Sequence, residues 1–190
     1  MNTPNRLLSE IRNYTQTCHT ELEAKLDLLN RVRVVDDYQK LLLKLYGFYA
    51  PLEEALGKWK PEFEGLGLAF EMREKTSLLL NDLDHFKLGK GLPADLPLPK
   101  TFAQAVGCLY VLEGSTLGAQ FICRHLKSLF KENDTSLSFY QGYGSSTGKM
   151  WQEFCEFLGR YSNQLKSESE FLEVSSSAKQ TFQIFGEWVC

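Results

Sequence analysis

The chain has 190 residues, of which 43% are hydrophobic. This composition can bury one continuous core, so we expect a single domain over residues 1–190. Its 24 Asp and Glu residues outnumber its 21 Lys and Arg residues and leave a net charge of −3, which argues against nucleic acid or an anionic membrane as the main partner. Only 3 histidines accompany 13 Phe, 8 Tyr and 3 Trp, which leaves little room for a metal site built from several histidines.

The cysteines and the apolar stretches indicate the compartment. Five cysteines occur without a C-x-x-C pair, as expected of reduced thiols rather than of a disulfide framework. The first residues, MNTPNRLLSEIRNYT, lack the apolar core of a secretory signal. The longest apolar stretch, around residues 41–56, is interrupted by Lys44 and Glu53, so we expect no membrane-spanning segment. The prediction is a cytoplasmic protein.

Apolar residues recur at helical spacing along nearly the whole chain, and no alternating runs are joined by a hairpin turn. The predicted fold is therefore an all-α, single-domain helical bundle. The predicted helices are, in chain order, one that starts from an N-cap at Thr3 and carries an apolar stripe to Leu29, then Val35 to about Gly57, Ala69 to Phe86, Thr101 to about Lys131, Lys149 to Leu165, and Glu170 to Val189.

Prolines predict the interruptions of this pattern. Pro51 lies inside an apolar helical pattern, which predicts either two helices or one bent helix there. Pro93, Pro97 and Pro99 exclude a continuous helix over residues 87–100. That segment is predicted to be a connecting loop.

Three glycines share one face of the predicted helix from Thr101. Gly107, Gly114 and Gly118 project within about 40° of one another, at 100° per residue. Each glycine costs roughly 1 kcal/mol relative to Ala in a helix interior, so the presence of three on one face has to be explained. Two explanations are equally good: close helix packing with a kink near residues 114–116, or close approach of the backbone to a ligand. Ser115 adds a hydroxyl beside this face, which can satisfy a carbonyl or order water.

His19 lies at the edge of the first apolar stripe, seven residues after Arg12 and four before Glu23, so the three share one helix edge. A lone histidine there is more often structural than a ligand. Glu23 favours a ligand, because a metal-binding imidazole usually has its other nitrogen held by a carboxylate, carbonyl or water. Arg12 could meet an anionic group roughly 10 Å from the imidazole, which suits a planar amphiphilic ligand. His85 and His125 are weaker candidates.

Several motifs are absent from the sequence. Neither G-x-G-x-x-G nor G-x-x-x-x-G-K-[ST] occurs, so no nucleotide site is evident. No Ser or Cys has partners at the spacing of a hydrolase triad. The aromatic residues at helical spacing are expected to be mostly core, with a few lining a pocket: Phe48, Tyr49, Phe154, Phe157, Phe182 and Phe185.

Five segments carry a resemblance that covers nearly the whole chain. They are TCHTELEAKL around His19, YQKLLLKLYGFYAPLE from Tyr38, REKTSLLLNDL from Arg73, LYVLEGSTLGAQF from Leu109 and YGSSTGKMWQEFCEFL from Tyr143. In this order they resemble the bacterial haem oxygenases, the branch found in pathogen iron acquisition and beside bacteriophytochromes. The combination is specific to that family.

The resemblance implies that haem, as both substrate and cofactor, lies between the first helix and the glycine helix. His19 would be the iron ligand. Gly114 and Gly118 would let the backbone pass close over the haem and shield bound O2. Ser115 lies where the mammalian branch has a carboxylate, which implies a differently organised water chain.

The resemblance also implies how the haem is held. Arg12, Tyr110 and Arg124 match positions that hold the haem propionates, and Arg12 replaces a Lys or Asn of the relatives. The implied reaction is oxidative cleavage of haem to biliverdin, iron and CO with O2. Because the chain has no nucleotide motif, the electrons would come from an external donor such as a ferredoxin or a flavin or NADPH reductase. Two alternatives stay open: a haem carrier or sensor without turnover, and an enzyme of the same fold that acts on a small cofactor precursor.

Overall fold

The computed structural model describes residues 5–130 and 136–190, with the side chains of Glu23 and Leu29 left out. These ranges contain helices and no strand, which confirms the all-α prediction. The elements are α1 (Arg6–Leu26), α2 (Leu28–Arg31), α3 (Val35–Gly57), α4 (Lys60–Gly65), the 3₁₀ helix η1 (Phe70–Arg73), α5 (Thr76–His85), α6 (Phe102–Leu129), α7 (Ser138–Gln141), the 3₁₀ helix η3 (Gly144–Ser146), α8 (Thr147–Ser162) and α9 (Glu168–Val189).

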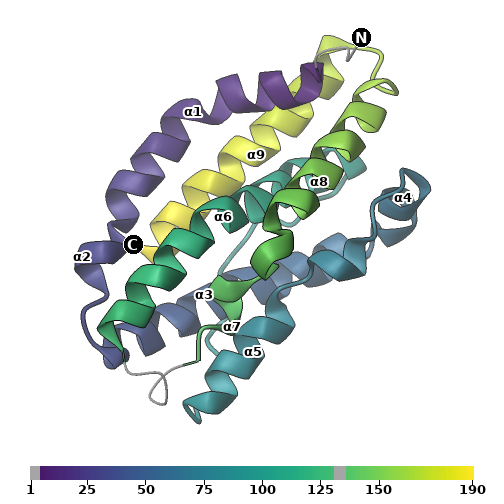
Figure 1. The fold of residues 1–190 in the computed structure, drawn as a ribbon. Coiled ribbons are helices and arrows are strands. Elements are labelled where there is room, and N and C mark those ends of the chain that lie inside the picture. Colours follow the sequence, from purple (N-terminus) through teal and green to yellow (C-terminus); the bar gives the residue numbers. More distant parts are fainter. Residues whose placement is uncertain (1–4, 131–135) are drawn as a thin grey trace.

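The longest helices pack around α9. This helix lies between α1 and α6 and makes extensive contacts with both, while α8 contacts α1 and α6 (Figure 1). Helix α3 packs against α5 and α9. The buried apolar side chains form one cluster to which all of these helices contribute, for example Ile11, Leu42 and Val174. Burying each such side chain stabilises the fold by roughly 1.5–3 kcal/mol.

Helix α6 runs through the middle of this bundle. By length and hydropathy it could cross a membrane, and it is the one helix of the described chain that meets both criteria. However, 56% of its most apolar window is buried by other parts of the protein. Burial of this kind is what a core helix of a bundle requires. At its start, the Thr101 hydroxyl accepts a hydrogen bond from the N–H of Gln104 and caps the helix.

Pro51 does not divide the second predicted helix, because α3 continues through it. Of the two outcomes that Pro51 predicted, the structure excludes two separate helices. Pro51 has no N–H to give to the carbonyl of Gly47, and this carbonyl instead accepts the N–H of Ala94 at 2.9 Å. The loop can come this close because Gly47 has no side chain: a Cβ there would lie 2.2 Å from the carbonyl oxygen of Leu92.

The prediction of one helix from Ala69 to Phe86 is wrong for the residues before Thr76. The chain forms η1 and starts a new helix, α5, at Thr76. The carboxylate of Glu53, from α3, accepts the N–H groups of Lys75 and Thr76 at 2.8 and 2.9 Å. It therefore satisfies donors that the first turn of α5 leaves unpaired. This cap comes from a residue more than 20 positions away, so local periodicity could not predict it.

Other ends differ slightly from the prediction. The first helix ends at Leu26, where Asp27 takes a positive φ of 30° before α2 begins. The predicted N-cap at Thr3 and the predicted end of the glycine helix at Lys131 lie outside the described residues. Helix α7 was not predicted at all.

Candidate functional site

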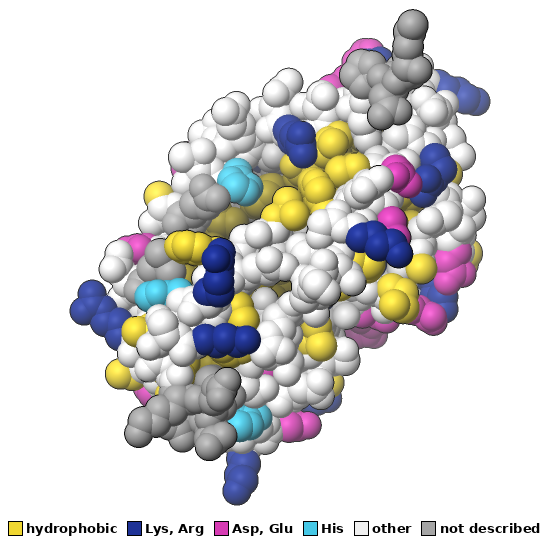
Figure 2. All heavy atoms as spheres, viewed as in Figure 1, with side chains coloured by type: hydrophobic (Ala, Val, Ile, Leu, Met, Phe, Trp, Pro, Cys, Tyr) yellow, Lys and Arg dark blue, Asp and Glu magenta, His cyan; other side chains and the backbone are white. Residues whose placement is uncertain are grey.

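A cavity of about 690 Å³ lies between α1 and α6. Side chains of α3, α7, α8 and α9 complete its walls, and most of its lining is apolar. Figure 2 shows a hollow on this face with hydrophobic side chains at its floor. Its volume falls within the roughly 300–1,000 Å³ that small-molecule sites usually have.

The wall formed by α1 includes His19. This side chain is exposed and lines the cavity. Its ring meets the ring of Phe182 edge-on, with 5.7 Å between the ring centroids and an angle of 74° between the planes. Phe182 belongs to α9 and is buried. The imidazole is thus supported by a packed aromatic side chain while it borders the cavity.

The facing wall is formed by the glycine face of α6. A Cβ added to Gly114 or to Gly118 would find no atom of another segment within 4 Å, and both glycines line the cavity. Gly107 is different, because a Cβ there would lie 2.4 Å from the carbonyl oxygen of Val174 on α9. The sequence left two explanations open for these glycines, close helix packing and close approach to a ligand. Each explanation applies to a different part of α6. Gly107 serves close helix packing, and Gly114 and Gly118 border open space.

One end of the cavity is polar. Arg12 and Thr15 of α1 and Tyr110 of α6 all line it. Burial raises the pKa of Tyr110, and the charge of Arg12 opposes this shift. Arg12 is exposed, so it can approach an anionic group at this end. The opposite end is apolar, with Leu26, Ile122 and other aliphatic side chains.

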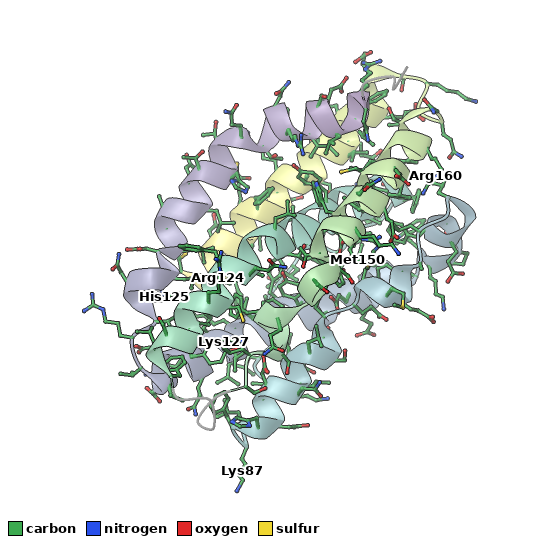
Figure 3. The ribbon with its side chains drawn as sticks, viewed as in Figure 1. Lys87, Arg124, His125, Lys127, Met150 and Arg160 are labelled. Atoms are coloured by element: carbon green, nitrogen blue, oxygen red, sulfur yellow. The ribbon has the colours of Figure 1, made fainter. Side chains whose placement is uncertain are left out.

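Arg124 does not line the cavity, unlike Arg12 and Tyr110. It lies on the C-terminal half of α6 beside His125 and Lys127 (Figure 3). Its guanidinium carbon is 5.9 Å from the ring centroid of Phe121, and both side chains are exposed. The side chain of Glu23, the predicted partner of His19, lies outside the described residues.

The aromatic residues divide as the sequence suggested, into core and pocket. The cavity lining includes Phe48, Tyr49, Phe182 and Phe185, whereas Phe154 and Phe157 are buried away from it. More of these rings line the pocket than expected. Neither His85 nor His125 lines the cavity. The ring of His85 meets that of Phe86 edge-on at 4.9 Å, at the end of α5.

A buried charge cluster behind the α6 wall was not predicted. The carboxylate of Glu113 is 1% exposed and accepts hydrogen bonds from Arg73, from Lys75 Nζ at 2.9 Å and from the Tyr143 hydroxyl at 2.7 Å. Arg73 and Lys75 are also buried, and the half-exposed Glu153 lies 3.6 Å from Arg73. Lys75 and Tyr143 reach the cavity lining. Burial, followed by the charge of Glu113, raises the pKa of Tyr143.

The floor of the cavity depends on Asp82. This fully buried carboxylate accepts the N–H groups of Ser138 and Phe139 at 2.7 and 2.9 Å and the hydroxyl of Ser136 at 2.5 Å. It therefore holds the first turn of α7, which presents Phe139 and Tyr140 to the cavity. The sequence offered no signal for this role, because Asp82 looks like an ordinary polar position of a surface helix.

Comparison with known proteins identifies the chain's relatives. The family model described as "Heme oxygenase" matches residues 5–190. The heme oxygenase of Xanthomonas campestris pv. campestris (strain 8004) is 34% identical over 93 residues, which are 48% of this chain and 54% of that protein. The chain thus matches about half the length of this curated relative.

The fold also has a counterpart among solved structures. The NO- and CO-bound heme oxygenase from Neisseria meningitidis superposes with a TM-score of 0.79, over 96% of this chain and 89% of that one, at 19% sequence identity. At this identity the likeness is one of fold. Together with the family match over residues 5–190, it confirms the resemblance found in the sequence: the chain belongs to the haem oxygenase family.

Proposed function

We propose that this protein is a haem oxygenase that opens haem to biliverdin, iron and CO, with O2 and electrons from an external donor. The observation that carries the proposal is the pairing of two walls in one cavity: His19 on α1 faces a strip of α6 that is bare of side chains at Gly114 and Gly118. The cavity thus offers a flat, iron-containing ligand one ligating side chain on one face and a close, smooth backbone on the other.

The cavity fits a haem in chemistry as well as in shape. Its lining is mostly apolar and rich in aromatic rings, which suits a porphyrin face, and Arg12 and Tyr110 at one end can bind the two propionates. No three His, Cys, Asp or Glu side chains of the described residues lie close enough to form a metal site. A porphyrin supplies four nitrogen ligands, so one histidine is a sufficient protein contribution.

When bound, haem supplies the iron and the electron-rich ring on which O2 chemistry takes place. The residues of this chain hold and orient it. His19 would bind the iron through a ring nitrogen. Arg12 and Tyr110 bind propionates and set the rotation of the ring in its plane. Because Arg124 lies outside the lining, we assign it no contact with a propionate that is seated at the Arg12 end.

On the other face, Gly114 and Gly118 keep the α6 backbone close to the ligand and exclude bulk water from it. A Cβ at these positions would occupy the slot itself. Electrons come from a separate protein, for which a ferredoxin or a flavin or NADPH reductase is suitable. We expect the protein to work in the cytoplasm.

The decisive experiment combines hemin binding with turnover. The purified protein should bind one hemin per chain and, with ascorbate and O2, convert it to biliverdin that chromatography identifies. His19→Ala should lose the spectrum of a histidine-ligated haem and all turnover. His125→Ala is the control: His125 lies on α6 but does not line the cavity, so this variant should retain both the spectrum and turnover. An unaltered His19→Ala spectrum contradicts the ligand assignment. Stoichiometric binding without biliverdin indicates a carrier or sensor instead.

A further inference from the structure

Arg124, which does not line the cavity, belongs to an exposed ridge on the C-terminal part of α6. We define this α6 ridge by Leu117, Phe121, Arg124 and Lys127, which follow one another at steps of three or four residues. Residues at these steps are neighbours on a helix surface. All four are exposed, the two apolar ones to 48% for Leu117 and 57% for Phe121, and Figure 3 shows where Arg124 and Lys127 lie on the helix.

The apolar part of the ridge has the composition of a protein contact. Leu117 and Phe121 are one helical turn apart, so they form a patch rather than two scattered side chains. The guanidinium carbon of Arg124 lies 5.9 Å from the centroid of the Phe121 ring, which makes the cation and the ring one continuous surface. Aromatic residues and Arg are enriched in protein interfaces and often dominate their binding energy.

The two cations of the ridge lack a carboxylate partner. Within the described part of the chain, no ion pair joins Arg124 or Lys127 to an Asp or Glu. Other exposed cations do form such pairs: Arg6, Lys40 and Lys149. Most Asp and Glu side chains visible in Figure 2 lie toward the right edge of that view, away from this part of α6. Because the chain is acidic overall, with a net charge of −3, an acidic partner is attracted to the ridge and repelled elsewhere.

The ridge lies beside the cavity. Leu117 belongs to both, since it is exposed and lines the cavity, and Gly118 and Ile122 of the same helical turns also line it. A protein seated on the ridge is therefore separated from a ligand in the cavity by at most about one helix diameter, roughly 10–12 Å. An electron donor for the cavity needs such proximity.

We propose that the α6 ridge is the docking site of the electron donor, and that this donor is a small one-electron carrier protein with carboxylates around its redox centre. The inference rests on the proposed haem oxygenase function, which requires external electrons. Leu117 and Phe121 form the apolar centre of the contact, and Arg124 and Lys127 attract and orient the acidic face. The ridge is only about 15 Å long at 1.5 Å per residue, which suits the small interfaces of weak redox encounters. In each encounter the reduced carrier loses one electron, the ferric iron of the bound haem gains it, and the oxidised carrier leaves.

The first test measures docking without turnover. The hemin-loaded protein is titrated in a calorimeter with an oxidised plant-type [2Fe–2S] ferredoxin, at ionic strengths of about 0.01 M and about 0.15 M. The wild type should lose roughly tenfold in affinity at the higher ionic strength, because salt screens exposed charges. Arg124→Glu/Lys127→Glu should bind roughly tenfold more weakly at low ionic strength, with little salt dependence. Phe121→Ala should lose roughly fivefold at an unchanged salt dependence, because it removes an apolar anchor and no charge.

Turnover gives a second readout, because ascorbate needs no docking site. With ferredoxin that its own NADPH reductase keeps reduced, the double variant should show a KM for ferredoxin raised roughly tenfold and little change in kcat. With ascorbate it should equal the wild type, also in hemin affinity, since neither cation lines the cavity. Lys58→Glu is the matched control, because Lys58 is exposed at the end of α3 and also lies outside the lining. It should match the wild type in both readouts, and thermal unfolding checks that all variants fold.

The outcomes separate the docking site from the function on which it rests. Equal ferredoxin affinity in the wild type and the double variant overturns the docking site. A wild type that turns over with ascorbate but binds no ferredoxin also overturns it. Binding to vesicles of anionic phospholipid in place of ferredoxin, lost in the double variant, assigns the ridge to a membrane surface and overturns it as well. A wild type that forms no biliverdin with either reductant overturns the proposed function, whatever its affinity for ferredoxin.

Discussion

The two halves of α6 carry glycines on the same face but use them in opposite ways. In the N-terminal half, residues 105–113 are all buried, and Gly107 allows the backbones of α6 and α9 to touch at Val174. From Gly114 onward, a Cβ added at Gly114 or Gly118 would meet no other segment within 4 Å, and both glycines border the cavity. The same residue at the same angular position serves packing or ligand access, depending on what lies opposite. Substitutions on each side of this boundary test the difference.

The largest effect is expected at Gly118. Gly118→Phe should retain hemin binding through His19 on the other wall, but turnover should fall to background because the ring fills the slot over the reacting face. The unfolding temperature of the protein without hemin should change little, since a side chain there enters open space. Hemin titration, the ascorbate assay and thermal unfolding measure the three quantities. Normal biliverdin production by Gly118→Phe contradicts the assignment of this half of α6.

Glu113 is the last residue of the buried half, and its replacement should cost the most stability. Glu113→Gln leaves the cations of Arg73 and Lys75 buried without their carboxylate, which typically costs about 3–5 kcal/mol. Denaturant unfolding measures this loss. Glu153→Gln is the control: that carboxylate is 45% exposed and lies 3.6 Å from Arg73, so it should cost less than about 1 kcal/mol. Equal losses in the two variants contradict the cluster's role.

Gly107→Ala tests the packed half directly. The new Cβ would lie 2.4 Å from the Val174 carbonyl oxygen, so the helices must separate, at a cost of roughly 1–3 kcal/mol. Gly114→Ala is the matched variant on the open half, and it should stabilise the protein without hemin by up to about 1 kcal/mol, because Ala favours the helix. The two variants should thus have opposite signs in thermal unfolding. Destabilisation by Gly114→Ala contradicts the distinction between the halves.

The smallest expected effect lies at the start of α9, which does not line the cavity. The N–H groups of Lys166 and Ser167 lie 2.6 and 2.9 Å from Glu170 and lower the pKa of its carboxyl. A lowered pKa means that the stabilisation is present above the ordinary value of about 4.5 and is lost as the pH falls below it. The difference in unfolding temperature between wild type and Glu170→Gln should therefore shrink below about pH 4.5. A difference that persists at lower pH contradicts this. At neutral pH, wild type and Glu170→Gln should bind hemin with the same affinity.

Long amphipathic helices were predictable from the sequence because their signals are local. The predicted helix from Thr101 is observed from Phe102, with Thr101 as its cap. The last helix was predicted two residues short at its start and ends at Val189 as predicted. Elements that depend on distant partners were missed or wrong. Helix α7 needs the carboxylate of Asp82, and Pro51 stays inside α3 because a loop N–H replaces the one it lacks.

The site divides in the same way. The glycine face and the shared edge of Arg12 and His19 are periodic features of single helices, so the sequence located both walls of the cavity. Other contacts at the site form only when α3, the segment before α5, and α6 come together. They are the hydrogen bonds of Tyr49 with Ser115 and of Lys75 with Glu113. Arg124 has the right residue type for a propionate ligand, yet its position on α6 leaves it outside the lining.

By itself, the sequence determined the helical class, the position of the long helices and the identity of His19 and the glycine face as candidates, because helical periodicity is written within one segment. Only the tertiary structure decided which glycines pack and which stay open, and which buried charges and hydroxyls meet behind the slot. Those outcomes depend on contacts between residues far apart in the chain, where a change of one helical turn, about 5 Å, replaces one partner by another.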